Sequence, residues 1–100
     1  NPKDKIIDIS EIKTKGFLRL KSENVPSVLG KEAAILGKYK INIRQFIQME
    51  KFEIIENNVV YTPDIIIIDP IEYSKINLAL SEFKKLGCIK GEPLYLRIED

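Results

Sequence analysis

The turn from Asn24 to Val28 is the part of this sequence whose residue types best suit the binding of a small charged ligand. Pro26 fits the first turn of a helix, and an amphipathic apolar pattern follows it. The first turn of a helix presents backbone N–H groups that lack intrahelical acceptors, together with partial positive charge. A carboxylate, or another stretch of backbone, is therefore a suitable partner for this turn.

Most familiar kinds of catalysis are excluded by composition. The chain has no histidine, and Cys88 is its single cysteine. These counts rule out a disulfide within the chain, a zinc site of cysteine and histidine ligands, and a histidine acid–base pair. A chain of 100 residues is one domain, too small to hold both a dinucleotide site and a substrate site. We expect this fragment to have no catalytic residues, no metal site and no cofactor of its own.

Charge and hydropathy limit the binding partners and the cellular compartment that we expect. The net charge is +1, and lysines and glutamates are interspersed, so we expect neither nucleic acid nor a membrane as a partner. No apolar run approaches the roughly 20 residues that span a bilayer, and the first residues do not resemble a secretory signal, which favours a cytoplasmic setting. Because the chain begins at Asn1, we expect it to be a piece of a longer polypeptide, with residues 1–15 as a linker from an upstream catalytic region and residues 16–100 as the folded domain.

The spacing of apolar residues predicts six regular elements. Alternation predicts strands at residues 17–21, 41–49 and 94–98, and the run Ile65–Ile68, apolar on both faces, predicts a central strand. Helical spacing predicts one helix that starts near Pro26 and a second that starts at Asp69 as its cap. The order β-α-β-β-α-β indicates an α+β, ferredoxin-like fold, with a four-stranded antiparallel sheet and two helices on one face. Residues 50–63 should form an extended hairpin or a long loop.

The same alternation predicts which side chains share a face. Gln45 should point away from the face of Gln48, and Glu32 should face water on the first helix. The open face of the sheet should be apolar enough to need a cover, and a second copy of the domain is the commonest cover. In the second strand the expected apolar face is Ile41, Ile43, Ile47 and Met49, and the expected mixed polar face is Asn42, Arg44, Phe46 and Gln48.

Several segments, in their order and spacing, carry a resemblance to a known family. They are Ile9-Ser10-Glu11-Ile12, Phe17-Leu18-Arg19-Leu20, the turn 23–29, the segment 35–43, Phe46-Ile47-Gln48 and the closing stretch 90–99. Together they resemble the ACT domains, small βαββαβ modules that bind amino acids and regulate enzymes of amino-acid metabolism. More narrowly, they resemble the C-terminal ACT domain of bacterial homoserine dehydrogenases.

This resemblance implies a function and a set of ligand-binding residues. It implies a free amino acid, threonine before others, bound between the turn of one subunit and the second strand of its partner, and hence a homodimer or a higher homo-oligomer. It also implies threonine feedback control in the aspartate family of amino acids, which includes methionine, with NAD(P) bound by the parent homoserine dehydrogenase. The implied ligand-binding residues are Asn24, Val25, Pro26, Ser27, Val28, Leu29 and Gln48, and Asn42 joins them by strand geometry alone.

Two departures from the family pattern leave alternatives open. Ser27 stands where the family has glycine, and Ile68-Asp69 stands where the family has a Thr-His pair. Both favour, as an alternative, a ligand-free ACT module that only dimerises. Asn24 could equally cap the helix, and Gln48 could be a solvated strand residue or an interface residue. RNA binding is suggested by the topology, which RRM domains share, and by Lys15-Gly16-Phe17, which echoes the start of an RNP1 motif on the wrong strand. An acylphosphatase is disfavoured because the arginine-bearing loop that it needs is missing from residues 23–28.

Overall fold

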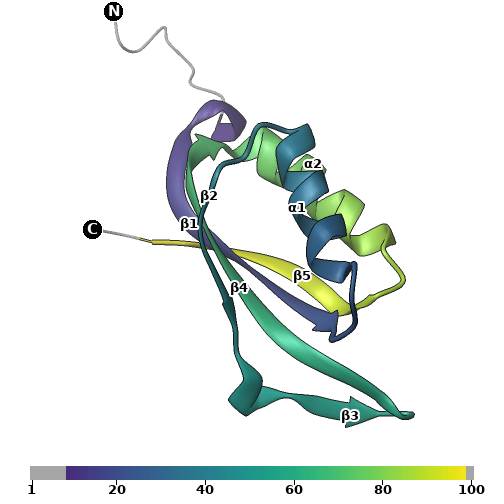
Figure 1. Cartoon of the computed structure of the whole chain (residues 1–100). Helices are drawn as coiled ribbons and strands as arrows, with labels where there is room; N and C mark the ends of the chain where they lie inside the picture. The colour runs from purple at the N-terminus through teal and green to yellow at the C-terminus, as the bar shows by residue number, and fades with distance from the viewer. Residues whose placement is uncertain (1–8, 99–100) are drawn as a thin grey trace, which may run out of the picture.

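The computed structural model describes residues 9–98, which form a five-stranded antiparallel sheet with two helices on one face (Figure 1). The strand order is β2-β4-β1-β5, and β3 pairs with β4 outside that path. No helix in the described range is long and apolar enough to cross a membrane. Along the chain the elements are the 3-10 helix η2 (Ile9–Glu11), β1 (Lys13–Glu23), α1 (Val28–Lys38), β2 (Ile43–Gln48), the 3-10 helix η3 (Glu50–Phe52), β3 (Ile54–Glu56), β4 (Val59–Glu72), α2 (Tyr73–Lys85) and β5 (Ile89–Arg97).

The predicted α+β order is confirmed, and the predicted count of four strands is wrong by one. The extra strand arises because residues 50–63 fold back as the hairpin that was one of the two expectations for this segment. Its turn residues Asn57 and Asn58 both have positive φ, as a two-residue hairpin turn requires. Figure 1 shows the β3 end of this hairpin projecting away from the two helices.

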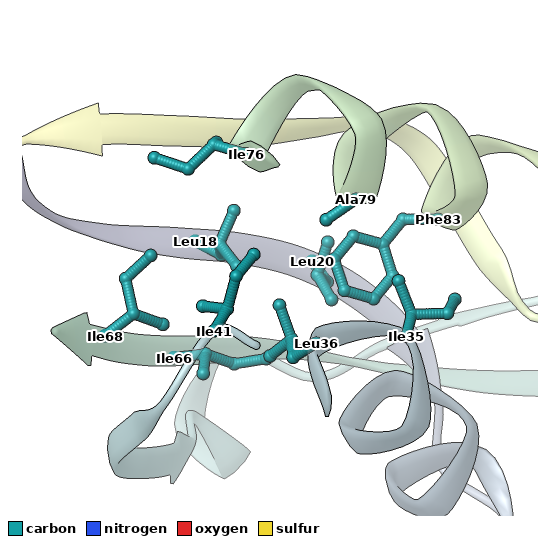
Figure 2. Close-up of a cluster of buried hydrophobic side chains, with 10 residues drawn as sticks. All are labelled: Leu18, Leu20, Ile35, Leu36, Ile41, Ile66, Ile68, Ile76, Ala79 and Phe83. Carbon is teal, nitrogen blue, oxygen red and sulfur yellow. The ribbon is translucent and has the colours of Figure 1, made fainter. Parts of the chain in front are cut away.

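The hydrophobic core lies between the helices and one face of the sheet. Figure 2 shows side chains from β1 and β4 pointing toward side chains from α1 and α2. Full burial of an aliphatic or aromatic side chain contributes roughly 1.5–3 kcal/mol, so this layer holds the helices on the sheet. The cluster consists of Leu18, Leu20, Ile35, Leu36, Ile41, Ile66, Ile68, Ile76, Ala79 and Phe83.

Strand β4 is the central strand that the isoleucine run predicted, but it is longer than expected. Ile66 and Ile68 are buried under the helices, while Ile65 and Ile67 lie half-buried on the open face. The strand continues past Asp69 to Glu72 because β1 begins at Lys13, early enough to pair with it. The prediction that Asp69 caps the second helix is therefore wrong, and α2 begins at Tyr73.

Strand β2 changes face at an irregularity that the alternation did not reveal. Ile43 pairs with Ile68, but Gln45 pairs with Ile67, so one extra residue is accommodated between them. Ile43 and Phe46 consequently both pack against the core, and the prediction that placed them on opposite faces is wrong. A shift of one residue exchanges the two faces of a strand. The prediction that Gln45 and Gln48 point to opposite faces is confirmed by their partners, Ile67 and Asp64.

Helix α1 begins at Val28, two residues after Pro26, and its buried stripe contains a charged residue. Val28, Ile35 and Leu36 are buried as expected. Glu32 is 0% exposed, which makes the prediction that it faces water wrong. The carboxyl lies on this stripe because it is four residues after Val28 and three before Ile35, one helical turn from each.

Candidate functional site

The turn between β1 and α1 has a defined backbone conformation. The Asn24 N–H donates to the carbonyl of Val60 at 2.8 Å, and the Val25 N–H donates to the carbonyl of Glu23 at 3.0 Å. Ser27, the N-cap of α1, has φ 80° and ψ −19°, in the left-handed region that favours glycine. This turn therefore adopts a glycine-type conformation with a serine in place.

The first turn of α1 leaves donors without acceptors inside the helix. The Ser27 side chain makes no capping hydrogen bond, and its carbonyl accepts the N–H of Lys31 at 3.0 Å. The N–H groups of Leu29 and Gly30 precede the first intrahelical bond and have no acceptor within the helix. The first turn also contains no acidic side chain that would offset the positive end of the helix dipole. An anion placed at this turn would meet both the donors and the dipole.

Around this turn, the side chains combine one buried anchor with an exposed surface. Val28 is 4% exposed and ties the start of α1 to the core. Val25 and Leu29 are 46% and 50% exposed and present apolar surface on either side of Ser27. Pro26 is exposed between them.

The amide of Asn24 is already engaged, by a partner from the hairpin segment. Its Nδ2 donates to Oε2 of Glu53 at 3.1 Å, and the hydroxyl of Thr62 donates to the same oxygen at 3.1 Å. Asn24 therefore does not cap α1, since Ser27 occupies that position. The sequence pattern did not predict Glu53 at this turn, because the β3–β4 hairpin brings it there.

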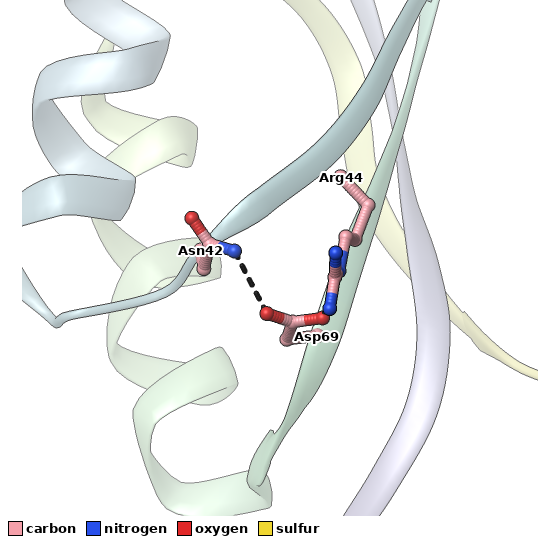
Figure 3. Close-up of polar contacts among 3 residues, drawn as sticks. All are labelled: Asn42, Arg44 and Asp69. Carbon is pink, nitrogen blue, oxygen red and sulfur yellow. Dashed lines mark hydrogen bonds and ion pairs between the residues drawn. The ribbon is translucent and has the colours of Figure 1, made fainter.

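Asn42 lies at the far end of the sheet and is not brought near the turn. Its Nδ2 donates to Oδ2 of Asp69 at 2.7 Å, and Arg44 pairs with the other oxygen of the same carboxylate (Figure 3). The hydrogen bond from Asn42, followed by that from Arg44, lowers the pKa of Asp69 below its ordinary value. Asp69 is eight residues along β4 from Tyr61, the partner of Glu23 beside the turn, which is roughly 25 Å at the rise of a strand.

Gln48 ends β2 and is exposed at the edge of the sheet. It pairs with Asp64 from one side of β4, whereas Leu20 of β1 pairs with Asp64 from the other side. Two strand spacings, about 10 Å, therefore separate Gln48 from the strand that leads into its own turn. Gln48 also lines a cavity of about 290 Å³ with Met49, Glu50, Lys51 and Phe52.

Behind the turn lies a buried polar cluster that the sequence analysis missed. Ser22, Glu32 and Asp64 are 2%, 0% and 2% exposed, and the Ser22 hydroxyl donates to Oε2 of Glu32. Burial is the main cause that raises the pKa of Glu32 to about 7, and it raises the pKa of Asp64 as well. The helical spacing of Glu32 with Val28, Ile35 and Leu36 was a signal that could have revealed the cluster.

Comparisons with solved structures identify the fold. The crystal structure of a homoserine dehydrogenase from Thiobacillus denitrificans superposes with a TM-score of 0.80 and 23% sequence identity over 96% of this chain and 20% of that chain. This chain thus spans a fifth of the length of that enzyme. A search of protein-family descriptions and of curated proteins found no match.

The ACT domain from GTP pyrophosphokinase of Chlorobium tepidum gives a second comparison. Its crystal structure superposes with a TM-score of 0.58 and 13% identity, over 84% of this chain and 99% of that chain. The solution NMR structure of the same domain gives a TM-score of 0.54, again with 13% identity, over 84% of this chain and 86% of that chain. The likeness to all three structures shows that residues 9–98 have the ACT-domain fold, as the sequence resemblance predicted.

Proposed function

We propose that this chain is an amino-acid-binding regulatory ACT domain of a homoserine dehydrogenase, and that threonine is its ligand. The observation that carries the proposal is the left-handed conformation of Ser27 at the start of α1. A backbone conformation that disfavours serine costs free energy, and such residues cluster at ligand sites. The superposition on a homoserine dehydrogenase over 96% of the chain supports the choice of parent enzyme. The parent would bind NAD(P) outside this domain and act in the cytoplasm.

The geometry of the turn indicates how an amino acid would be held. Its carboxylate would accept hydrogen bonds from the N–H groups of Leu29 and Gly30, at the positive end of α1. Its remaining polar atoms would meet the amide of Gln48 from a second copy of the chain, because Gln48 lies two strands away from its own turn. For regulation, the ligand must bind more tightly to one arrangement of the two copies than to another.

The open face of the sheet supports the proposal of a homodimer. Leu94 and Leu96 of β5 are 36% and 41% exposed there, and they pair with Arg19 and Phe17 of β1. Ile65 and Ile67 of β4 continue the same face. An apolar sheet face of this kind is stabilised when another sheet covers it, and a second copy supplies a matching surface.

One observation favours the second candidate, a ligand-free ACT module that only dimerises. The amide of Asn24 donates to Glu53 within the same chain, so it is not available to a ligand unless that bond breaks. Ser27 also places a side chain where a glycine would leave room for a ligand to approach the backbone.

Isothermal titration calorimetry with a panel of amino acids tests the proposal. Threonine should bind, and Gln48→Ala should weaken binding by about tenfold, the effect of one lost hydrogen bond. Asn77→Ala is the control, since Asn77 is an exposed amide on α2, away from both the turn and the open face of the sheet. It should leave the affinity unchanged. Ser27→Gly should bind threonine at least as tightly as the wild type, because glycine adopts the turn conformation without strain.

Sedimentation velocity on the same samples separates the two candidates. A dimer that binds no amino acid in the panel would select the ligand-free module. A monomer under all conditions would contradict both candidates, because each places the site or the function between two copies.

A further inference from the structure

Two carboxyl groups, those of Glu32 and Asp64, interact directly between α1 and the sheet, at a place closed to water. Glu32 comes from the second turn of α1 and Asp64 from β4, and they are 0% and 2% exposed. Ser22, the residue two positions before Asn24, completes the cluster from β1. The cluster therefore lies directly behind the turn between β1 and α1.

The hydrogen bonds around the pair supply too few donors for two ionised carboxylates. The hydroxyl of Ser22 donates to Oε2 of Glu32, whereas Oε1 of Glu32 and Oδ1 of Asp64 have no donor among the described residues. The hydroxyl of Thr62, the other buried polar group on this part of β4, donates outward to Glu53. A buried carboxylate oxygen without a donor is strongly unfavourable.

Within the described part of the chain, the two carboxyl groups have no compensating cation. Among residues 9–98, no lysine or arginine forms an ion pair with Glu32 or Asp64. The elements packed against the pair contribute Ser22 from β1, Thr62 from β4 and Gln48 from β2, all of them neutral. Glu53, which accepts a hydrogen bond from Thr62, would only add negative charge. Two ionised carboxylates in contact without a cation repel each other, and the usual resolution is that they share a proton.

We propose that Glu32 and Asp64 share one proton at neutral pH, and that the resulting carboxyl–carboxylate hydrogen bond latches α1 to β4. The protonated oxygen of one group donates to the unpartnered oxygen of the other, which satisfies both orphan atoms with a single proton. The Ser22 hydroxyl holds the second oxygen of Glu32. Loss of the proton removes the latch and leaves two like charges in its place.

This latch makes the stability of the domain depend on pH in a defined direction. Burial raises the pKa of Glu32 from its ordinary 4.5 to about 7. Between these values the folded chain holds a proton that the unfolded chain has released, so the contribution of this group to stability is complete below about pH 4.5 and is lost as the pH rises to about 7. The slope should reach one proton, a tenfold rise in the unfolding equilibrium constant per pH unit.

If the turn also binds an amino acid, which rests on the proposed function, the latch would regulate that site. Its deprotonation adds one negative charge behind the positive end of α1, where the ligand carboxylate would lie. Affinity for threonine should then fall as the pH rises through about 7.

Urea unfolding between pH 4.5 and 8.5 tests the latch without any ligand. The wild type should lose stability with the predicted slope, and Glu32→Gln should remove the slope, because glutamine donates to Asp64 at every pH. Asp64→Asn should reduce the slope without abolishing it, because the amide can donate to ionised Glu32 while burial still favours its protonated form. Asp69→Asn is the matched control on the same strand and should keep the wild-type slope. A wild type that is flat over this range, or a Glu32→Gln variant that keeps the slope, would overturn the proposal.

NMR titration of the side-chain carboxyl carbons of the wild type keeps the test valid if a variant fails to fold. One carboxyl of the pair should titrate near neutral pH, and titration of both below pH 5 would overturn the proposal. The measurement of threonine affinity tests the proposed function separately from the latch. A chain that binds no threonine but shows the slope contradicts the proposed function and leaves the latch supported.

Discussion

Asp64 and Asp69 lie five residues apart on β4, and the fold gives them opposite surroundings. Asp64 points under the helices, is 2% exposed, and has its pKa raised by burial. Asp69 lies at the other end of the strand, where Asn42 and Arg44 contact its carboxylate and lower its pKa. The two residues carry the same side chain and lie on the same strand. The neighbours that the fold supplies decide which form, protonated or ionised, is stabilised.

The two ends of the sheet are therefore held in different ways. At the Asp64 end, defined by Ser22, Glu32 and Asp64, the polar groups are excluded from water. Their contribution to the stability of the fold depends on the proton that Glu32 and Asp64 share. At the Asp69 end the polar contacts lie at the surface, and close packing of the side chains beneath them stabilises the sheet. There the ring of Tyr95 lies over Gly16, and its hydroxyl hydrogen-bonds Thr14 at 2.7 Å.

The largest expected effect comes from disturbing that packing with Gly16→Ala. A Cβ at Gly16 would lie 2.3 Å from the ring of Tyr95, well inside van der Waals contact. The ring is held by Thr14 and by an edge contact with Tyr73, so it has little room to move. We expect a loss of about 3 kcal/mol in the free energy of unfolding, nearly the same at pH 5 and pH 8, as measured by urea denaturation.

Two further variants show whether the clash is the cause. Gly37→Ala should stabilise the chain by up to about 1 kcal/mol, because a Cβ at Gly37 meets no atom within 4 Å and alanine favours the helix. In a Tyr95→Ala background, Gly16→Ala should cost much less. An undiminished cost in that background would show that Tyr95 is not the obstacle.

The next effect is at the opposite end of the sheet, where Ser22→Ala removes the hydroxyl that donates to Glu32. We expect a loss of about 1–2 kcal/mol, the cost of leaving a buried polar group without its partner. The Ser22 hydrogen bond favours the ionised form of Glu32, so the loss should be larger at pH 8 than at pH 5. Ser81→Ala, at an exposed position of α2, should change stability by less than about 0.5 kcal/mol. An equal loss of stability at pH 5 and pH 8 would contradict the proposed electrostatic difference between the two ends of the sheet.

The contrast also explains what the sequence could predict. The core stripes of α1 and α2 and the central isoleucine strand follow from periodicity, and these predictions hold for Leu36, Ile66 and Phe83. The faces of β2 do not follow, because the irregularity between Ile43 and Gln45 depends on pairing with β4. Glu32 was assigned to water by its charge although its spacing placed it on the buried stripe. The charge of a residue is a poor guide to its exposure where tertiary contacts determine whether that residue is ionised.

The candidate turn was predicted in outline and not in its contacts. Its position before α1 follows from the sequence pattern, and the choice of residue 27 as a departure follows from the family resemblance. The engagement of Asn24 by Glu53 does not, since it requires the hairpin to return to β1. Asn42 was grouped with the turn by strand geometry, and only the register shows that the two lie at opposite ends of the sheet.

The smallest effect should come from the surface contacts of Asp69. Asn42→Ala removes the hydrogen bond that lowers the pKa of Asp69 most, and Arg44→Gln removes the second cause, so the pKa should rise toward 3.8 in both variants and further in the first. The wild-type contacts stabilise the chain above that ordinary pKa, and their contribution is lost as the pH falls through the lowered value. The difference from the wild type should therefore shrink toward acid pH, whereas the effect of Ser22→Ala grows toward alkaline pH.

NMR titration of the Asp69 carboxyl measures this effect directly, and Arg19→Gln, at an exposed arginine of β1, is its control. High salt should reduce the Arg44 part of the shift more than the Asn42 part, because the pair with Arg44 is screened by ions. An Asp69 that titrates at the same pH in the wild type, in Asn42→Ala and in Arg44→Gln would mean that its surroundings do not lower its pKa. The two aspartates of β4 would then differ only through the burial of Asp64.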